Sequence, residues 1–278
     1  MKKIIFIDFD GTLLGDDKEI SAANIDAITK ATQLGYQIVP CSGRNVDSIL
    51  IKFNDHLKKI INYIIANNGS VIHDLHKNKY IHSRLLDTQS VTDLYNLCTQ
   101  RSLLFNIYCL DGCYVNADEL IKKTRAQGMI PSNAEKFFKN KKVIAAFIRD
   151  RDFDKMKALE SDILRVPNVQ ISNRHKGLVD PGFLENNTSR FFYDITTTNI
   201  SKGSGAKILC EMLNVNIANT IAIGDDTNDV SMLAECGYGV AMGNALPEVK
   251  KIAKEITDTN NNDGVAKFLN KLFTKEQK

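Results

Sequence analysis

The 278-residue chain lacks the patterns that mark membrane, exported and zinc-binding proteins. No uncharged apolar stretch approaches the roughly 18 residues that cross a bilayer. The apolar run near the amino terminus extends only from Ile4 to Ile7 before Asp8 interrupts it, which is too short for a signal peptide. The six cysteines form no C-x-x-C pair and share no zinc-ligand spacing with the five histidines. We therefore expect a soluble, cytoplasmic protein whose cysteines are reduced thiols.

The chain also lacks a strong excess of charge of either sign. Its 36 basic and 33 acidic residues give a formal net charge of +3, which argues against nucleic acid or an anionic membrane as the main partner. Internal repeats and low-complexity tracts are absent as well. What remains is the composition of an ordinary globular enzyme, with 43% apolar and 25% charged residues, and a length that allows two domains.

The first 83 residues alternate buried strands with helices. The run KIIFIDF at residues 3–9 is continuously apolar, as strands are when helices cover both of their faces. A helix is predicted over residues 21–34, with Gly35 as its carboxyl-terminal cap. The alternation continues with a strand in YQIVPCSGR, a helix over residues 47–57, and a strand with a turn in YIIANNGSVI. This order predicts an α/β fold with a doubly wound, Rossmann-like parallel sheet.

The end of the chain repeats this pattern, and the middle departs from it. Strands are predicted in NTIAIGDD and YGVAM, and helices in SKGSGAKILCEMLN, NDVSMLAECG, PEVKKIAKE and DGVAKFLNKLF. The middle instead mixes helices with antiparallel strands, including a hairpin that turns at Asp111-Gly112, and it ends in a long loop over residues 172–189. We therefore predict a core domain of residues 1–83 and 191–278, to which the strand FFYDIT returns. Residues 84–190 are predicted to form an inserted α+β domain.

Two carboxylates stand at the end of the first predicted strand, in Asp8-Phe9-Asp10-Gly11-Thr12. Period-two alternation places Asp8 and Asp10 on one side of an extended chain, and Gly11 permits a sharp turn after them. Ligands of open α/β sheets bind beyond the carboxyl ends of the strands. Because neighbouring carboxylates repel each other, this pair favours a divalent cation or a shared proton. The alternative is a turn whose aspartates only cap the next helix.

Two further segments place donors for an anion at the ends of predicted elements. Ser42-Gly43-Arg44 offers a hydroxyl and backbone N–H groups after the second strand, an arrangement that can bind phosphate oxygens. Lys202 opens a helix, where a lysine is unfavourable beside the positive end of the dipole unless it faces an anion. The alternatives are that Ser42 is a plain helix cap and that Lys202 is solvated. Arg44 is expected to pair with a nearby acid, with contact to the substrate as its alternative.

Three acidic residues gather after the later strand, in Gly224-Asp225-Asp226-Thr227-Asn228-Asp229. Three carboxylates so close in sequence form an oxygen-rich site suited to magnesium. A helix cap accounts for one acid but not for three. A metal site is therefore the interpretation that we adopt for this segment.

Together, these four motifs resemble those of the haloacid dehalogenase superfamily, and within it the Cof-type (class IIB) phosphatases. The resemblance rests on D-F-D-G-T, S-G-R, S-K-G and G-D-D-x-N-D, together with Gly243-Asn244-Ala245 and the stretch from Asn261 to Val265. It covers both ends of the chain, roughly residues 1–83 and 191–274. The middle matches only in position and size, because these phosphatases carry a large cap domain inserted there.

The resemblance implies a Mg²⁺-dependent phosphatase that hydrolyses a small phosphorylated metabolite, either a sugar phosphate or a nucleotide or cofactor phosphate. Asp8 would be the nucleophile that forms an aspartyl-phosphate, and Asp10 would be the general acid and base. Asp8, Asp10 and Asp225 would hold the metal. Phosphate binding would fall to Phe9, Ser42, Gly43, Lys202 and Asn228, with Thr12, Asp226 and Asp229 in supporting positions.

Finer expectations concern individual side chains of the core. Thr12 is expected to orient Asp10 through its hydroxyl, with a plain cap as the alternative. Asp229 is expected to orient the metal ligands or to pair with Lys202. Asp10 is expected to have a raised pKa because it stands beside other carboxylates, including Asp8.

In the predicted inserted domain, Arg174 and Lys176 stand at the start of the long loop. In the family this part of the cap faces the active site and helps to choose the substrate. The hypothesis is that both side chains contact the anionic or polar end of the leaving group, against the interpretation that they are simply exposed. The expected partner is a small phosphate ester, and the expected assembly is a monomer or a homodimer.

Two alternatives to a phosphatase share its chemistry. A phosphomutase-type phosphotransferase would use the same nucleophile and pass the phosphoryl group to an acceptor hydroxyl instead of water. A phospho-accepting signalling module also gathers acids and a lysine on a doubly wound sheet. Such a module is much shorter and has no inserted domain, so it is the more remote of the two.

Overall fold

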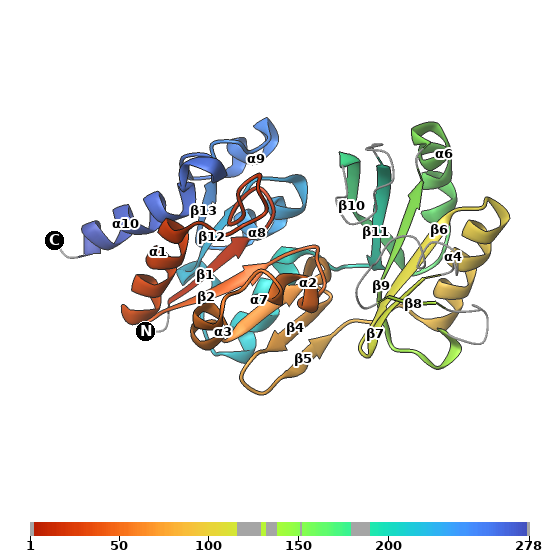
Figure 1. Cartoon of the computed structure of the whole chain (residues 1–278), viewed down its shortest axis with the longest axis horizontal. Coiled ribbons are helices and arrows are strands. Elements are labelled where there is room, and N and C mark those ends of the chain that lie inside the picture. Colours follow the sequence, from red (N-terminus) through yellow and green to blue (C-terminus); the bar gives the residue numbers. More distant parts are fainter. Residues whose placement is uncertain (1–2, 116–128, 132–137, 151, 179–189, 277–278) are drawn as a thin grey trace. The chain divides into compact units, whose positions relative to one another are not determined.

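The computed structural model describes residues 3–115, 129–131, 138–150, 152–178 and 190–276. The chain divides into two compact units (Figure 1). The core unit comprises Met1–Ser83 and Ser201–Lys278, and the inserted unit comprises Arg84–Ile200. Each unit has its own β-sheet and its own buried apolar residues.

The core unit is built on an eight-stranded sheet with the order β14-β13-β12-β1-β2-β3-β4-β5. The strands from β14 to β3 in this order run parallel, and β4 and β5 add an antiparallel edge. This confirms the predicted α/β class, with a sheet that is mostly rather than purely parallel. The strands are β1 (Lys3–Asp8), β2 (Tyr36–Cys41), β3 (Tyr63–Ala66), β4 (Val71–Asp74), β5 (Lys79–Ser83), β12 (Ile221–Gly224), β13 (Tyr238–Ala241) and β14 (Glu255–Ile256).

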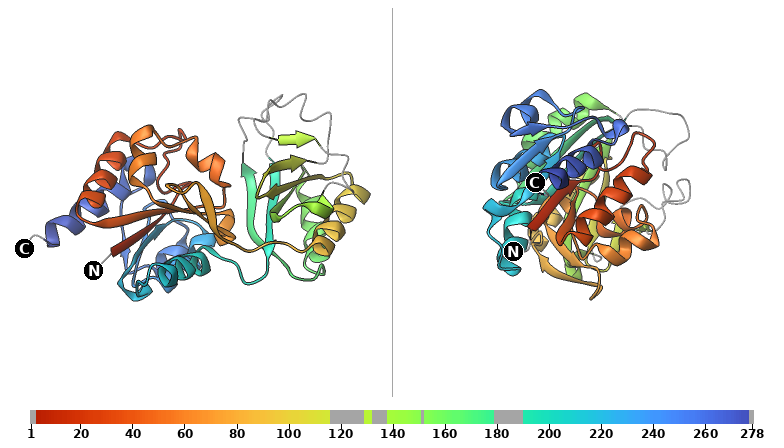
Figure 2. Two further views of the ribbon diagram at one scale, coloured as in Figure 1. Left: turned by 90° about the horizontal axis from the view of Figure 1, so that it is seen from below. Right: turned by 90° about the vertical axis from the view of Figure 1, so that its left-hand side faces the viewer.

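Helices cover both faces of the core sheet, which explains why its central strands are continuously apolar. Helix α1 (Ala22–Gln33) packs against α10 (Gly264–Glu276) on one face. Helix α7 (Lys202–Met212) packs against α8 (Val230–Glu235) on the other (Figures 1 and 2). Between these layers, residues 4–7 of β1 are 0% exposed. None of the helices formed by the described residues combines the length and the apolar character that a membrane crossing requires.

Local capping decides where the shorter helices begin. The single helix predicted over residues 47–57 is wrong, because the chain forms α2 (Val46–Leu50) and α3 (Asp55–Ile60). The side chain of Asn54 accepts the N–H of Leu57 and so starts a second helix. The other short helices described in the core unit are α8, α9 (Pro247–Ile252) and the 3₁₀ turns Asn67–Gly69, Ile217–Asn219, Thr227–Asp229 and Asn260–Asn262.

The inserted unit is an α+β module with the strand order β10-β11-β9-β6-β7-β8. Helices α4 (Thr88–Gln100) and α6 (Phe153–Ile163) cover one face of this sheet (Figure 1). The predicted hairpin is β6 with β7, and Cys109 pairs with Gly112 at its turn. The strands are β6 (Leu104–Cys109), β7 (Gly112–Val115), β8 (Met129–Pro131), β9 (Val143–Asp150), β10 (Val169–Leu178) and β11 (Arg190–Thr197).

Strand β11 lies in the sheet of the inserted unit, not in the core sheet. It pairs antiparallel with β9 and β10, and its Tyr193 and Ile195 side chains pack among the buried residues of that unit. The prediction that FFYDIT returns to the core is therefore wrong, and residues 191–200 belong to the inserted unit. Strand β10 extends to Leu178 and takes up the first part of the loop predicted over residues 172–189. Residues 179–189 lie outside the described part of the chain.

Candidate active site

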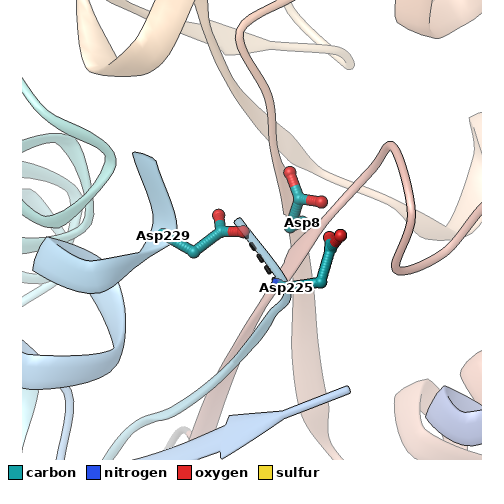
Figure 3. A group of neighbouring side chains, drawn as sticks. All are labelled: Asp8, Asp225 and Asp229. Carbon is teal, nitrogen blue, oxygen red and sulfur yellow. Dashed lines mark hydrogen bonds between the residues drawn. The ribbon is translucent and has the colours of Figure 1, made fainter. Parts of the chain in front are cut away.

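The carboxyl ends of β1 and β12 lie side by side, and acidic residues stand at both. Asp8 is the last residue of β1, and Asp225 follows the last residue of β12. Three of these acids form a cluster, in which one carboxylate oxygen of each residue lies within 4.8 Å of those of the other two. They are Asp8, Asp225 and Asp229 (Figure 3). The sheet thus brings together acids from the two ends of the chain, at the edge where ligands of such sheets bind.

Lys202 opens α7, and its ammonium group lies between two of these carboxylates. Its side chain is 1% exposed, and Nζ lies 2.5 Å from Asp8 Oδ1 and 2.6 Å from Asp229 Oδ1. The other oxygen of Asp229 accepts the backbone N–H groups of Asp225 and Asp226, at 2.9 and 3.0 Å. The lysine at the positive end of the helix dipole therefore faces anions and not solvent.

The acids outnumber the cation in this cluster, and their pKa values respond to it. Burial, together with the charge of Asp229, raises the pKa of Asp8 well above its usual value. The same two causes raise the pKa of Asp225 to about 6. Burial alone would lower the pKa of Lys202, but the carboxylates of Asp229 and Asp8 outweigh it and raise that pKa. The cluster therefore holds more negative charge than one ammonium group offsets.

The donor set fits a divalent cation such as Mg²⁺. All three acids offer hard carboxylate oxygens, the ligands that Mg²⁺ takes in proteins. Three ionised carboxylates and one ammonium leave an excess of two negative charges. A divalent cation would offset this excess and lower the pKa values of Asp8 and Asp225.

The carboxylate of Asp10 is paired with basic side chains. Nε and Nη2 of Arg44 donate to the two carboxylate oxygens of Asp10 at 2.6 and 2.7 Å, and Lys18 Nζ lies 3.8 Å from one of them. Burial would raise the pKa of Asp10, but the hydrogen bonds and the charge of Arg44 outweigh it and lower that pKa. The predicted rise is therefore wrong for Asp10 and falls on Asp8 and Asp225 instead. The expected pairing of Arg44 with a nearby acid is confirmed.

The turn that follows Asp10 lies directly against Asp225. Thr12 Oγ1 donates to Asp225 Oδ1 at 2.8 Å, so the expectation that Thr12 orients Asp10 is wrong and its hydroxyl orients Asp225. Gly11 has a φ of +77°, and a Cβ atom there would lie 2.4 Å from Asp225 Oδ2. The side chain of Asn244 donates to the carbonyl oxygen of Gly11 at 2.8 Å and holds this turn from the carboxyl-terminal half. This contact of Asn244 cannot be read from the sequence, where Asn244 stands out only as part of the motif Gly243-Asn244-Ala245.

The hydroxyl of Ser42 lies after β2, at the same edge of the sheet. Ser42 is 1% exposed, and its Oγ accepts the N–H of Arg44 at 3.1 Å. Accepting this bond leaves the hydroxyl hydrogen able to donate to an anion. Asn45, and not Ser42, caps the helix that follows, so the plain-cap alternative is wrong. Gly43, between them, is partly exposed.

Three other residues predicted to belong to the site differ in the groups that could contact a ligand. The Phe9 side chain is 0% exposed and packs against the Phe53 ring, so only its backbone could meet a ligand. Asp226 caps the short turn after β12 by accepting the N–H of Thr227 at 2.6 Å. Asn228 donates from Nδ2 to Asn68 Oδ1 at 2.9 Å.

Sequence reasoning missed Asn68, because it treated the residues after β3 only as a turn. The sequence did hold a signal, since two asparagines followed by glycine at the end of a strand favour positive φ values. What it could not show is that this turn reaches Asn228, which lies 160 positions further along the chain.

Arg174 and Lys176 lie in β10, not in a loop. Nε and Nη2 of Arg174 contact Glu160 Oε1 of α6 at 2.9 and 2.5 Å, so this side chain lies on the helix-covered face of the sheet. A register shift between Ile171 and Asn173 sets that side. Arg174 is therefore committed to an ion pair within the inserted unit, against the expectation that it contacts a leaving group. The side chain of Lys176 lies outside the described residues.

Comparison with known proteins identifies the class to which this fold and site belong. The sequence profile of the haloacid dehalogenase-like hydrolases matches residues 5–269, so the chain belongs to that family, as its motifs predicted. It is 30% identical over 268 residues to the 5-amino-6-(5-phospho-D-ribitylamino)uracil phosphatase YcsE of Bacillus subtilis (strain 168), covering 96% of this chain and 94% of that protein. It is 26% identical over 291 residues to phosphatase YwpJ of the same organism, covering 98% and 100%.

A solved structure supports the same assignment. The crystal structure of a haloacid dehalogenase-like hydrolase from Bacteroides thetaiotaomicron matches with a TM-score of 0.80 at 26% identity, covering 98% of this chain and 100% of that one. The similarity extends over the whole chain, the middle included. The protein is therefore a haloacid dehalogenase-like hydrolase whose named relatives include phosphatases.

Proposed function

We propose that this chain is a magnesium-dependent phosphatase that hydrolyses a small phosphorylated metabolite. The observation that carries the proposal is the position of Asp8, a buried carboxylate at a strand end with one oxygen held by Lys202 and with Asp225 beside it. Such a carboxylate keeps its second oxygen for attack on phosphorus. The family membership and the names of the relatives support the same activity.

The acidic cluster would hold the metal. We assign the ligands to the carboxylates of Asp8 and Asp225 and to the backbone carbonyl of Asp10, with Asp229 supporting them through Lys202 and the backbone. When bound, Mg²⁺ supplies positive charge that offsets the repulsion between nucleophile and phosphate and stabilises the transferring oxygens.

The reaction would proceed in two displacements at phosphorus. A carboxylate oxygen of Asp8 attacks phosphorus in line, the bond from phosphorus to the leaving oxygen breaks, and Asp10 gives that oxygen a proton. Asp10 then takes a proton from water as the water oxygen attacks the aspartyl-phosphate, which releases inorganic phosphate and restores Asp8. Because Arg44 pairs with Asp10 in this structure, we propose that this ion pair opens before Asp10 carries a proton.

The phosphate oxygens would be held by donors from separate segments. We assign this role to the Ser42 hydroxyl, the Gly43 and Phe9 backbones, Lys202 and Asn228. For the substrate we place a sugar or polyol phosphate first and a nucleotide or cofactor phosphate second, since the substrate named for YcsE carries its phosphate on a ribityl chain. We assign the inserted unit the role of the cap domain that this class of phosphatase carries.

A panel of phosphorylated metabolites tests the function. With Mg²⁺ present, the purified protein should release inorganic phosphate from at least one sugar, polyol or nucleotide phosphate. An excess of EDTA should abolish the release, because the acidic cluster then lacks its counter-charge. Phosphate is measured colorimetrically, with the Asp8→Asn variant as the blank. Rates that never exceed this blank for any ester would sink the proposal.

Replacing Asp225 tests the metal site separately. Asp225→Asn removes one of three carboxylates from the cluster and should raise the Mg²⁺ concentration for half-maximal activity by about tenfold to a hundredfold. The measurement is a Mg²⁺ titration of initial rates. The exposed Asp26 of α1 provides the matched control, since Asp26→Asn should leave the requirement unchanged. Equal Mg²⁺ requirements in the two variants would contradict the assignment of Asp225.

A further inference from the structure

The turn after β3 holds three consecutive residues in the left-handed region. Asn67, Asn68 and Gly69 have φ values of +50°, +55° and +101°, and both asparagines are 2% exposed. Residues other than glycine rarely adopt a positive φ, and such strain persists only where the surroundings over-determine it. The contacts of this turn therefore indicate what it serves.

The first contact is with the segment that follows β2. The N–H of Asn67 donates to the carbonyl oxygen of Arg44 at 2.9 Å, and the N–H of Asn68 donates to that of Ser42 at 3.0 Å. In return, the N–H of Ser42 donates to the carbonyl oxygen of Ile65 at 2.9 Å. The backbone of Ser42 is thus fixed from the turn and from the strand before it.

The second contact is with the first turn of α7, which carries Lys202. A Cβ atom placed on Gly69 would lie 2.1 Å from the carbonyl oxygen of Ser201, the capping residue of that helix. A Cβ atom placed on Gly205 would lie 3.1 Å from the Cα atom of Gly69. The two backbones are so close that only glycine fits at position 69, and the start of α7 rests directly on the turn.

The third contact is made by the side chain of Asn68. Asn228 donates from Nδ2 to Asn68 Oδ1 at 2.9 Å. Because an amide oxygen can only accept, this bond turns the nitrogen of Asn228, and not its oxygen, toward Asn68. The second hydrogen on that nitrogen is then left to donate, which is the polarity that a phosphate oxygen requires.

We infer that Asn68 is a positioning residue for the phosphoryl group, an inference that rests on the proposed function. The three segments that supply Ser42, Lys202 and Asn228 all meet at this one turn. Asn68 bonds to two of them, to Ser42 through its backbone and to Asn228 through its side chain. It acts on the phosphate through these residues and sets the direction of the Asn228 donor.

Asn68→Gly isolates the side chain, because glycine accepts the same φ and keeps the N–H that bonds to Ser42. We expect kcat/KM to fall about tenfold to a hundredfold, and inhibition by inorganic phosphate to weaken by a similar factor, because a misdirected donor serves the anion poorly. The matched control is Asn214→Gly, at an exposed asparagine with a φ of +54° after α7. That variant should keep the wild-type kinetics, and melting curves of both variants report on folding.

A double-variant cycle with Asn228→Ala separates positioning from simple support of the fold. If Asn68 acts through Asn228, Asn68→Gly costs little more in a chain that already carries Asn228→Ala. Losses that multiply would overturn the inference, as would wild-type kinetics in Asn68→Gly. An Asn228→Ala variant with unchanged phosphate inhibition would overturn it too, since Asn68 would then have nothing to act through. These outcomes leave the proposed function standing, whereas a wild-type protein that hydrolyses no ester removes both.

Discussion

Replacing Asp8 with asparagine should lower kcat by about 10⁴-fold or more with every substrate that the wild-type protein hydrolyses. The amide has nearly the shape of the carboxylate but lacks the charge and the lone-pair basicity of a nucleophile. The substitution should not unfold the protein. It removes one of three mutually repelling carboxylates, and the Lys202 ammonium keeps its contact with Asp229. The melting temperature of the metal-free variant should therefore equal or exceed that of the wild-type protein.

The two readouts together test the role of Asp8. Initial rates are measured by phosphate release, and melting is followed by circular dichroism in EDTA. Asp26→Asn, at an exposed aspartate of α1, should change neither quantity. A near-wild-type rate in Asp8→Asn would end the assignment of Asp8 as nucleophile. A strongly destabilised Asp8→Asn would show instead that this carboxylate serves the fold.

The sequence was sufficient to predict that Asp8 and Asp225 lie close together, because both residues stand at the ends of predictable strands. Buried parallel strands are recognised by continuous apolar runs, and their carboxyl ends meet at one edge whatever the distance along the chain. The proximity of Asp8 and Asp225 therefore follows from the sequence, and the register of Ile7 with Ile223 agrees. The same logic failed for the pKa of Asp10, because its sign depends on the direction in which Arg44 points. The spacing of residues in the sequence does not predict the direction of that side chain.

The inserted unit was harder to predict because its sheet is irregular. A strand such as β11 shows its alternation in sequence but not which sheet it joins, so it was assigned to the core. In β10, a register shift between Ile171 and Asn173 changes the face on which the following side chains lie. Arg174 consequently pairs with Glu160 of α6. A bulge of one residue is invisible to period-two reasoning, yet it reverses the conclusion about where an arginine can act.

Replacing Lys202 with methionine should lower the free energy of unfolding in EDTA by about 3–5 kcal/mol. The ammonium group is the cation that Asp8 and Asp229 share, and the lysine side chain is 1% exposed. Without it, these buried carboxylates lose their counter-charge, whereas methionine retains most of the apolar volume. Urea denaturation measures the effect. Lys207→Met, at an exposed lysine of the same helix, should change the free energy by no more than about 0.5 kcal/mol.

Two additional measurements identify charge as the cause of this loss. Adding Asp8→Asn to Lys202→Met should recover about 1 kcal/mol or more relative to Lys202→Met alone, because one uncompensated carboxylate is then gone. Mg²⁺ should stabilise Lys202→Met more than it stabilises the wild-type protein, because the cluster without its lysine holds a larger excess of negative charge. If Lys202→Met were as stable as Lys207→Met, the acids would not be ionised in the metal-free fold. The excess of negative charge would then no longer support a divalent cation beside Asp8.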